Sequence, residues 1–453
     1  MTRERRLMKH TTCLAMALFV VLLAAASGCA SPQPATSTAL EISLDLNDGT
    51  MTAVGDYARG DITGNTFLLN RSFTITKLLV DGKKIDPGKI VEQVSLNPSG
   101  IGLGMVAIYT LPHATNFIHV EYAGSLDGTT GTAPYVKETI SPNFTFLRWE
   151  TFCMPIFADL SSLDTALDDP LSITVTVDVP SGSTVEFTSE TTSTMETADR
   201  TLFSTHTDLP VAQIAAAVAH YQTVSLSTGD YSFLDSAPTD QTLGAIDSVM
   251  TQAYSFMNTH FGTRTFTQPF RSVEIPQGLG SFEVPPSHMA YIDSSAYWSK
   301  LSMGQLVHEF IHSGWNPLVS DPEVRKARFF DEAFTTYFQY RAMADQLGEQ
   351  AMTPMLASLS DLRGYSPMPI SEFGSQGAGD LSYTIGALCL YKLSQLIGVD
   401  SFDRITTQFL ADFTDTPADF DSFCGEYERG SGDPRVTQFF DDWIYTDTYA
   451  SGL

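Results

Sequence analysis

Residues 303–317 read MGQLVHEFIHSGWNP, and this stretch holds two histidines four positions apart, His308 and His312. Apolar residues around them recur at spacings of three and four, which predicts a helix. Positions i and i+4 share one helix face, so both imidazoles can reach one metal ion. Glu309 follows the first histidine, where its carboxylate can take a proton from water on that ion. The alternative is a helix with two surface histidines, and a third ligand would decide the question.

A candidate third ligand lies in RFFDEAFTTYFQYRAM, residues 328–343. The aromatic residues predict a largely buried helix, and a carboxylate in the first turn of such a helix needs compensation for its burial. Binding a cation is the simplest compensation, so Glu332 is the candidate. Its neighbour Asp331 is expected to cap the helix. The alternative is that Asp331 accepts a hydrogen bond from the ring nitrogen of a ligand histidine that does not bind the metal. Two imidazoles and one carboxylate suit Zn²⁺, and one zinc ion per chain is expected.

HEFIH followed by FFDEAFTTYF resembles the gluzincin zinc metallopeptidases of the aminopeptidase N and leukotriene hydrolase family. HSGWNP adds some likeness to the glycyl aminopeptidases. Nineteen residues separate His312 from Glu332, one more than in the family pattern, and Asp-Glu-Ala replaces Asn-Glu-Gly. The additional residue falls in the stretch 316–326, which is expected to be a loop, where an insertion costs little.

Two further stretches resemble parts of that family's active site. In DLSYTIGALCLYKLSQLIG, Tyr383 and Gly386 match the family's Tyr-x-x-Gly helix. The resemblance implies that the Tyr383 phenol stabilises an oxyanion, and the alternative is a core tyrosine on an amphipathic helix. In GSFEV, Gly280 and Glu283 are candidates for the family's Gly-x-Met-Glu-Asn strand, although phenylalanine and valine replace methionine and asparagine. The resemblance implies that Glu283 holds the free amine of a substrate.

The hydrophobic pattern divides the chain into two parts. Between residues 40 and 228 apolar and polar residues alternate, as in LEISLDLND (40–48) and LSITVTVDVP (171–180), which predicts antiparallel strands with one buried face. Between 229 and 453 helical spacing dominates. The resemblance implies a saddle-like N-terminal β domain over 40–228 and a thermolysin-like α+β, mainly helical, catalytic domain over 229–453. It also implies a rather open cleft, because no counterpart of the family's long C-terminal helical domain precedes Leu453.

The first 28 residues are expected to be a lipoprotein signal peptide. A basic segment precedes the apolar run CLAMALFVVLLAAA, residues 13–26, which is short for a membrane span. Small residues then precede Cys29, which resembles the lipidated cysteine of bacterial lipoproteins. An ordinary signal peptide is the alternative. Residues 29–39 are expected to be a lipidated tether that holds the protein on the cell membrane, facing outside the cytoplasm.

The chain of 453 residues is strongly acidic, with 52 Asp and Glu against 25 Lys and Arg and a net charge of -27. A chain of this length favours two domains over one. No run of basic residues offsets the negative charge, so the composition argues against a nucleic-acid partner.

These patterns together predict a surface-anchored zinc metallopeptidase that acts on peptides or proteins, and an aminopeptidase is the first expectation. Zinc on His308, His312 and Glu332 would activate water and polarise the scissile carbonyl. Glu309 would be the general base, and Tyr383 would stabilise the oxyanion. Two alternatives stay open: an endopeptidase at the same site, and a non-catalytic lipid-anchored binding protein.

Overall fold

The structure, a computed structural model, describes residues 37–58, 60, 64–96, 103–126, 128, 137–261, 269–284, 287–315, 317–348 and 364–452. The expected signal peptide, Cys29 and the tether up to residue 36 lie outside these residues. Within the described part of the chain, no helix has both the length and the apolar character needed to cross a membrane.

Strands dominate the described chain up to residue 219. The largest sheet has eight strands in the order β12-β13-β10-β1-β2-β8-β4-β5, and two three-stranded sheets have the orders β11-β14-β9 and β3-β7-β6. The bounds are β1 (Thr38–Asp45), β2 (Thr50–Ala58), β3 (Thr66–Asn70), β4 (Thr74–Val80), β5 (Lys83–Lys84), β6 (Val91–Leu96), β7 (Leu103–Thr110), β8 (Phe117–Ser125), β9 (Thr145–Leu147), β10 (Ile173–Pro180), β11 (Thr184–Phe187), β12 (Thr191–Glu196), β13 (Arg200–Thr207) and β14 (Ala216–Ala219).

Burial alternates along β10, where Ile173, Val175, Val177 and Val179 are buried and the residues between them are partly exposed. This is the period of two that the sequence predicts for a strand with one buried face. Each such side chain contributes roughly 1.5–3 kcal/mol through burial. The neighbouring strand β1 runs parallel to β10, whereas the other pairs of these sheets are antiparallel in the described residues.

A separate five-stranded sheet follows, in the order β15-β16-β17-β19-β18. Its strands are β15 (Tyr221–Leu226), β16 (Gly229–Leu234), β17 (Phe270–Ile275), β18 (Phe282–Val284) and β19 (Met289–Asp293). The strand β18 forms one edge and pairs antiparallel with β19. The hairpin of β15 and β16 spans the domain division expected at residue 228, and that division stays a prediction.

Helices make up most of the remaining chain. The α-helices are α2 (Leu163–Asp168, within the β-rich part), α3 (Asp240–Phe261), α4 (Gly304–His312), α5 (Pro322–Lys326), α6 (Phe334–Leu347), α8 (Ile385–Ile397), α9 (Val399–Asp412), α10 (Phe420–Ser431) and α11 (Arg435–Phe440). Two π-helical turns are η7 (Phe329–Ala333) and η11 (Asp441–Tyr445). The 3₁₀ turns are η1 (Pro87–Lys89), η2 (Trp149–Thr151), η3 (Leu160–Ser162), η4 (Val211–Gln213), η6 (Ser294–Tyr297), η9 (Ile370–Glu372), η10 (Gly379–Tyr383) and η12 (Thr448–Gly452).

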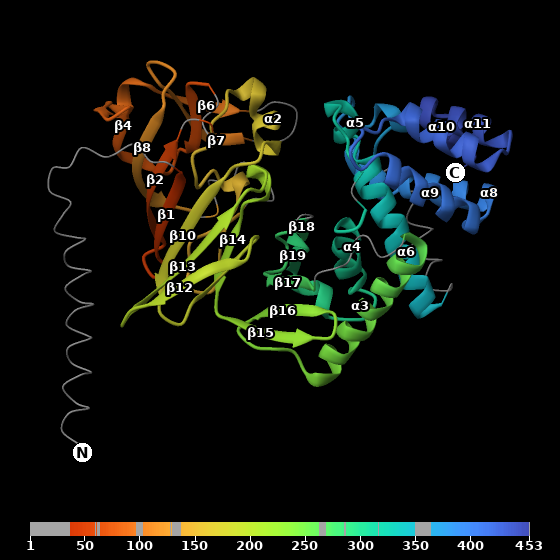
Figure 1. Ribbon diagram of the computed structural model, residues 1–453, viewed down its shortest axis with the longest axis horizontal. Coiled ribbons are helices and arrows are strands. Elements are labelled where there is room, and N and C mark those ends of the chain that lie inside the picture. Colours follow the sequence, from red (N-terminus) through yellow and green to blue (C-terminus); the bar gives the residue numbers. More distant parts are fainter. Residues whose placement is uncertain are drawn as a thin grey trace.

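Figure 1 shows the β-rich part on one side, the helices on the other, and the five-stranded sheet between them. Aromatic packing fixes this sheet against the β-rich part. The ring of Phe146, in β9, lies 4.8 Å from that of Tyr291 in β19 and 5.7 Å from that of Phe282 in β18. The chain that leaves β9 therefore runs close to the edge strand β18.

A second aromatic cluster holds α4 against α6. Trp315, just after α4, stacks on Phe334 of α6 with ring centroids 4.3 Å apart, and its Nε1–H donates to the carbonyl of Phe330 at 2.6 Å. Phe330 and Phe334 in turn pack against Phe423 of α10. These buried contacts set the distance between the two elements that carry the candidate metal ligands.

Candidate metal centre and active site

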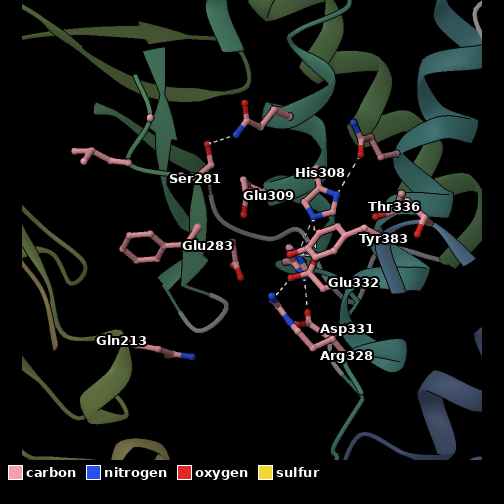
Figure 2. Close-up of a pocket in the computed structure, with 18 of the residues that line it drawn as sticks. Gln213, Ser281, Glu283, His308, Glu309, Arg328, Asp331, Glu332, Thr336 and Tyr383 are labelled. Atoms are coloured by element: carbon pink, nitrogen blue, oxygen red, sulfur yellow. Dashed lines mark hydrogen bonds and ion pairs between the residues drawn. The ribbon is translucent and has the colours of Figure 1, made fainter. Parts of the chain in front are cut away.

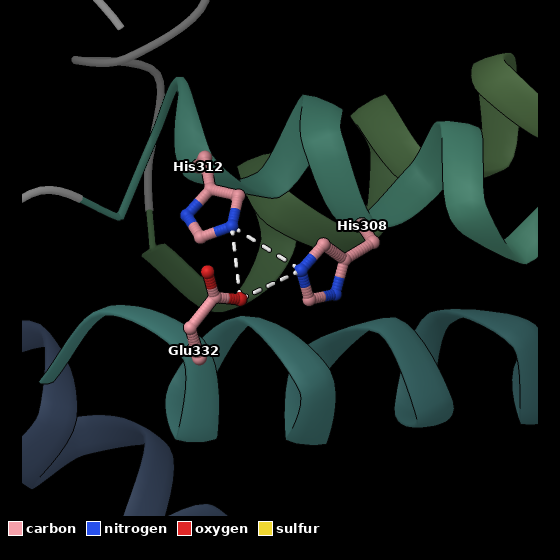
Figure 3. Close-up of side chains that lie close together, drawn as sticks. All are labelled: His308, His312 and Glu332. Carbon is pink, nitrogen blue, oxygen red and sulfur yellow. Dashed lines mark hydrogen bonds and ion pairs between the residues drawn. The ribbon is translucent and has the colours of Figure 1, made fainter. Parts of the chain in front are cut away.

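The helix α4 presents two imidazoles to a carboxylate on the π turn η7 (Figure 3). The Nε2 atoms of His308 and His312 lie 3.2 Å apart. One oxygen of Glu332, Oε2, lies 3.0 Å from Nε2 of His308 and 3.4 Å from Nε2 of His312. All three side chains are buried. The structure therefore brings together the three residues that the sequence suggests as metal ligands.

The other nitrogen of each imidazole has its own partner. Nδ1 of His308 lies 3.1 Å from Oε1 of Gln339, and Nδ1 of His312 lies 2.9 Å from Oδ1 of Asp331. Because both partners are oxygen acceptors, each Nδ1 carries a hydrogen and each Nε2 can turn a lone pair toward Glu332. Asp331 thus supports a histidine. Its expected role as a helix cap is wrong, because Arg328 occupies that position and makes no capping hydrogen bond.

Three lone-pair donors that face one another need a positive charge between them. Burial alone would lower the pKa of His312, but Asp331 and Glu332 raise it well above its usual value. In the metal-free protein, a proton on His312 can therefore supply that charge. A divalent cation supplies it to all three donors at once, and two imidazoles with one carboxylate are a donor set that zinc accepts. The residues present fit the metal that the sequence suggests.

The local backbone explains how Glu332 reaches α4. The π turn Phe329–Ala333 precedes α6, and such turns often occur at functional sites. The helix α8 packs directly against this turn, because a Cβ atom on Gly386 would lie 2.8 Å from Cβ of Ala333. Gly386 is therefore required for close packing, which is the physical reason for the glycine in the Tyr-x-x-Gly resemblance.

The three ligands line a cavity of about 980 Å³ (Figure 2). Glu309 lines it and is buried. Burial raises the pKa of Glu309, and the neighbouring imidazoles of His308 and His312 partly offset that rise. A carboxylate with a raised pKa beside a metal site is suited to accept and return a proton.

Tyr383 also lines the cavity, at the end of η10. Its ring lies 5.9 Å from the ring of His308, with 23° between the two planes. Burial raises the pKa of Tyr383, so its phenol stays neutral and can donate a hydrogen bond. The alternative of a tyrosine enclosed in the core does not match this position.

Glu283 lies in the edge strand β18 and Gly280 lies just before that strand, and both line the cavity. Gly280 has a φ of +75°, and no atom lies within 4 Å of the place where a Cβ would stand. Oε1 of Glu283 accepts a hydrogen bond from Oγ of Ser313 at 2.8 Å. Burial raises the pKa of Glu283 well above its usual range. Among the described residues, no lysine or arginine forms an ion pair with this carboxylate.

The sequence patterns do not indicate several of the residues that line the cavity. Arg148, Glu150 and Gln213 reach the cavity from the β-rich part, far away along the chain. Arg328 precedes η7, which carries Glu332, and Gln339 lies in the following helix α6. Helical periodicity could have identified Gln339, because it stands seven positions after Glu332 and so shares its face.

No protein family model and no curated protein matches the sequence. Solved structures match the fold. A mutant M1 zinc metallopeptidase from Deinococcus radiodurans, bound to a Tyr-Ser-Ala substrate, has a TM-score of 0.60 and 14% identity over 90% of this chain and 93% of that chain. Another structure of M1 zinc metallopeptidase from this organism gives 0.58 and 15%, over 90% and 92%. Yeast leukotriene A4 hydrolase in complex with bestatin gives 0.59 and 14%, over 91% and 67%.

The chain therefore has the fold of the M1 zinc metallopeptidases and leukotriene A4 hydrolase, as the resemblance in its motifs implies. The expected fold class, a β-sheet region followed by a mainly helical α+β region, is confirmed. At identities near 15%, these likenesses establish the fold alone.

Proposed function

We propose that the chain is a zinc metallopeptidase whose metal is held by His308, His312 and Glu332. The observation that carries this proposal is the meeting of three buried donor atoms within 3.4 Å, with each imidazole oriented from behind by its own acceptor. Zinc bound there would polarise a carbonyl and activate water.

The neighbouring side chains supply the remaining chemistry. Glu309 takes a proton from the attacking water and passes it to the leaving amine, which its raised pKa favours. Tyr383 donates a hydrogen bond to the oxyanion that forms as the carbonyl is attacked. An idle site would have no need for a buried base and a buried phenol beside the ligands, and this argues against the binding-protein alternative.

The edge strand β18 suits a peptide substrate. Its unpaired edge borders the cavity, and an extended peptide can add to such an edge through main-chain hydrogen bonds. Gly280 leaves space for the peptide to approach. Glu283 lies on the same strand and forms no ion pair with a lysine or arginine of the described residues, and the charge of His312 offsets its burial only in part. The ammonium group of a peptide N-terminus would compensate that burial further. These features favour an aminopeptidase.

An endopeptidase at the same site is the second candidate. The cavity of about 980 Å³ can hold several residues of a peptide, and valine stands where the exopeptidase motif has asparagine. The two candidates differ in one respect that can be measured. An aminopeptidase requires a free N-terminus, whereas an endopeptidase also cleaves N-acetylated peptides.

The deciding experiment is mass spectrometry of a mixed peptide library, free and N-acetylated, after incubation with the zinc-loaded protein. Glu309→Gln serves as the blank. Stepwise trimming from free N-termini only would establish the aminopeptidase and keep Glu283 as the candidate for holding the substrate amine. Internal cuts in both libraries would establish the endopeptidase. No cleavage beyond the blank, by protein with one zinc per chain, would overturn the proposal.

Cys29 supports a further part of the proposal, a lipid anchor on the outer side of the cell membrane. The support is the signal-like sequence of residues 1–28, which ends in small residues before this cysteine. Cys29→Ser is expected to release the protein from the membrane fraction. An unmodified Cys29 in the mass spectrum of the mature protein would contradict the anchor.

A further inference from the structure

Arg328, which lines the cavity beside the metal site, has an unusual backbone conformation. It has a φ of 55°, in the left-handed region that side-chain-bearing residues rarely adopt, and it immediately precedes the π turn. Gly379 makes room for it, because a Cβ at that position would lie 2.5 Å from the carbonyl oxygen of Lys326 and 3.3 Å from Cγ of Arg328. Strain of this kind often marks a side chain with a function.

The guanidinium of Arg328 contacts the acidic groups around the site. Nη2 forms an ion pair with Oε1 of Glu332 and lies 3.4 Å from Oδ2 of Asp331. Cζ lies 5.4 Å from the centre of the Tyr383 ring. Figure 2 shows Arg328 beside Asp331 and below Glu332 and Tyr383. One guanidinium thus touches the ligand carboxylate, the carboxylate behind His312 and the phenol ring.

Glu332 therefore has a different partner for each of its two oxygens. Oε2 faces both imidazoles, whereas Oε1 faces Arg328. A carboxylate that is held in this way offers a metal one oxygen instead of two. The guanidinium also draws negative charge away from the ligand and repels a second cation at short range, because the carboxylate is almost fully buried.

We propose that Arg328 is a positioning residue that holds Glu332 to one-oxygen coordination, and that it weakens the binding of the divalent metal while making the bound metal more electrophilic. This inference rests on the metal site of the proposed function. It predicts that removal of Arg328 strengthens zinc binding, which loss of an ordinary structural ion pair would not do. Loss of a structural support loosens a metal site, whereas loss of a competing cation tightens it.

The experiment measures the zinc dissociation constant of the full-length protein by competition with a chromophoric chelator. In Arg328→Met the constant is expected to fall on the order of tenfold, because a unit charge has left a nearly buried carboxylate. Arg328→Lys keeps the charge, so its constant is expected to lie closer to that of wild type than the constant of Arg328→Met does. An unchanged or larger constant in Arg328→Met would overturn the inference.

Two further variants make the measurement robust. Arg325→Met is the matched control, because Arg325 is as exposed as Arg328, at 42%, but pairs with Asp168 and touches no ligand. Its zinc dissociation constant is expected to stay unchanged. Arg328→Gly covers the case in which Arg328→Met does not fold, because glycine accepts the positive φ without strain. It is expected to bind zinc as tightly as Arg328→Met, and weaker binding than wild type counts against the inference.

Turnover provides a second readout. Zinc-loaded Arg328→Met is expected to lose kcat at least tenfold with little change in KM, because the metal is less electrophilic while the substrate contacts remain. A KM effect alone would contradict the proposed role. The zinc dissociation constant can be measured without any peptidase activity. A protein without peptidase activity that shows the predicted zinc affinities would refute the proposed function only, and an active protein with unaltered affinities would refute only the role of Arg328.

Discussion

Replacing the Glu309 carboxylate by an amide keeps the size of the side chain and removes its ability to take a proton. For Glu309→Gln we expect kcat/KM to fall by roughly 10²–10⁴, the range for loss of a general base. The zinc content, measured by plasma mass spectrometry, is expected to stay at one per chain because Glu309 is not among the three ligands. Full activity with full zinc would exclude Glu309 as the base.

The phenol oxygen of Tyr383 is the group that we expect to bind the oxyanion. Tyr383→Phe is expected to lower kcat by about 10²–10³ with a small change in KM, as for loss of one oxyanion donor. Tyr391→Phe, on α8 outside the cavity residues, is the control and is expected to keep its activity. Equal effects of the two changes on steady-state kinetics would point to a packing role for Tyr383.

Spacing along one helix made three residues of the site predictable. His308, Glu309 and His312 lie within five residues, so the geometry of a single helix sets their relation. Glu332 could be predicted because a carboxylate in an aromatic helix is costly without a cation. The contribution of Arg328 could not be predicted, because its direction depends on a positive φ and on the space that Gly379 leaves.

At the scale of elements, a charged cluster joins three helices behind the metal site. Asp403 of α9 accepts from Nη2 of Arg341 in α6 at 2.9 Å and lies 2.5 Å from Nδ1 of His260 in α3. Burial alone would raise the pKa of Asp403, but hydrogen bonds from Arg341 and His260 lower it below its usual value. The cluster therefore stabilises the folded protein when Asp403 is ionised.

The sign of the pH dependence follows from that lowered pKa. The stabilisation is fully present above the pKa of an aspartate in the unfolded chain, about 4, and is lost as the pH falls through the lower folded value. Asp403→Asn is expected to cost about 3–5 kcal/mol at pH 7, because Arg341 loses its partner. The difference from wild type, measured by chemical denaturation between pH 3 and 7, should shrink toward the acid end. A constant difference would exclude this linkage.

The π turn and the edge strand illustrate what periodicity misses at this scale. The aromatic run predicts a helix over 328–343, but residues Phe329–Ala333 form a wider π turn, against which α8 and Trp315 pack. The strand β18 has only three residues, too few for alternation to identify it. Both features depend on tertiary contacts, which hydrophobic patterns along the chain do not encode.

At the scale of the molecule, the metal would tie together two elements whose connection contains the short helix α5 (Pro322–Lys326), where the sequence predicts a loop. Its ligands come from α4 and from η7, which packs against α8 and α10. Zinc at a thousandfold excess over its dissociation constant is expected to stabilise the folded protein by about 4 kcal/mol. A chelator should lower the melting temperature in wild type and have no such effect in His308→Ala. Equal melting curves with and without zinc would contradict binding by the native state.

The contribution of the β-rich part to the cavity is likewise a property of the whole fold. Arg148 and Glu150 follow β9, whose Phe146 packs against β18 and β19. Alternation in the sequence predicts the sheets of this region. It does not predict which of their connections borders the site, because that depends on how the two regions pack.

The ion pair between Arg325 and Asp168 links α5, in the helical part, to α2, in the β-rich part. Figure 1 shows these two helices above β18 and α4, whereas the packing of Phe146 on Tyr291 joins the β-rich part to the five-stranded sheet. The β-rich part is thus joined to the helical part by an ion pair and to the five-stranded sheet by aromatic packing, and it contributes Arg148, Glu150 and Gln213 to the cavity. A cavity of about 980 Å³ between these parts is large enough for a few residues of an extended chain and too small for a folded domain. For the proposed peptidase, the folded state of a protein would then be its own protection, and unfolded or already fragmented chains would be the material that is degraded.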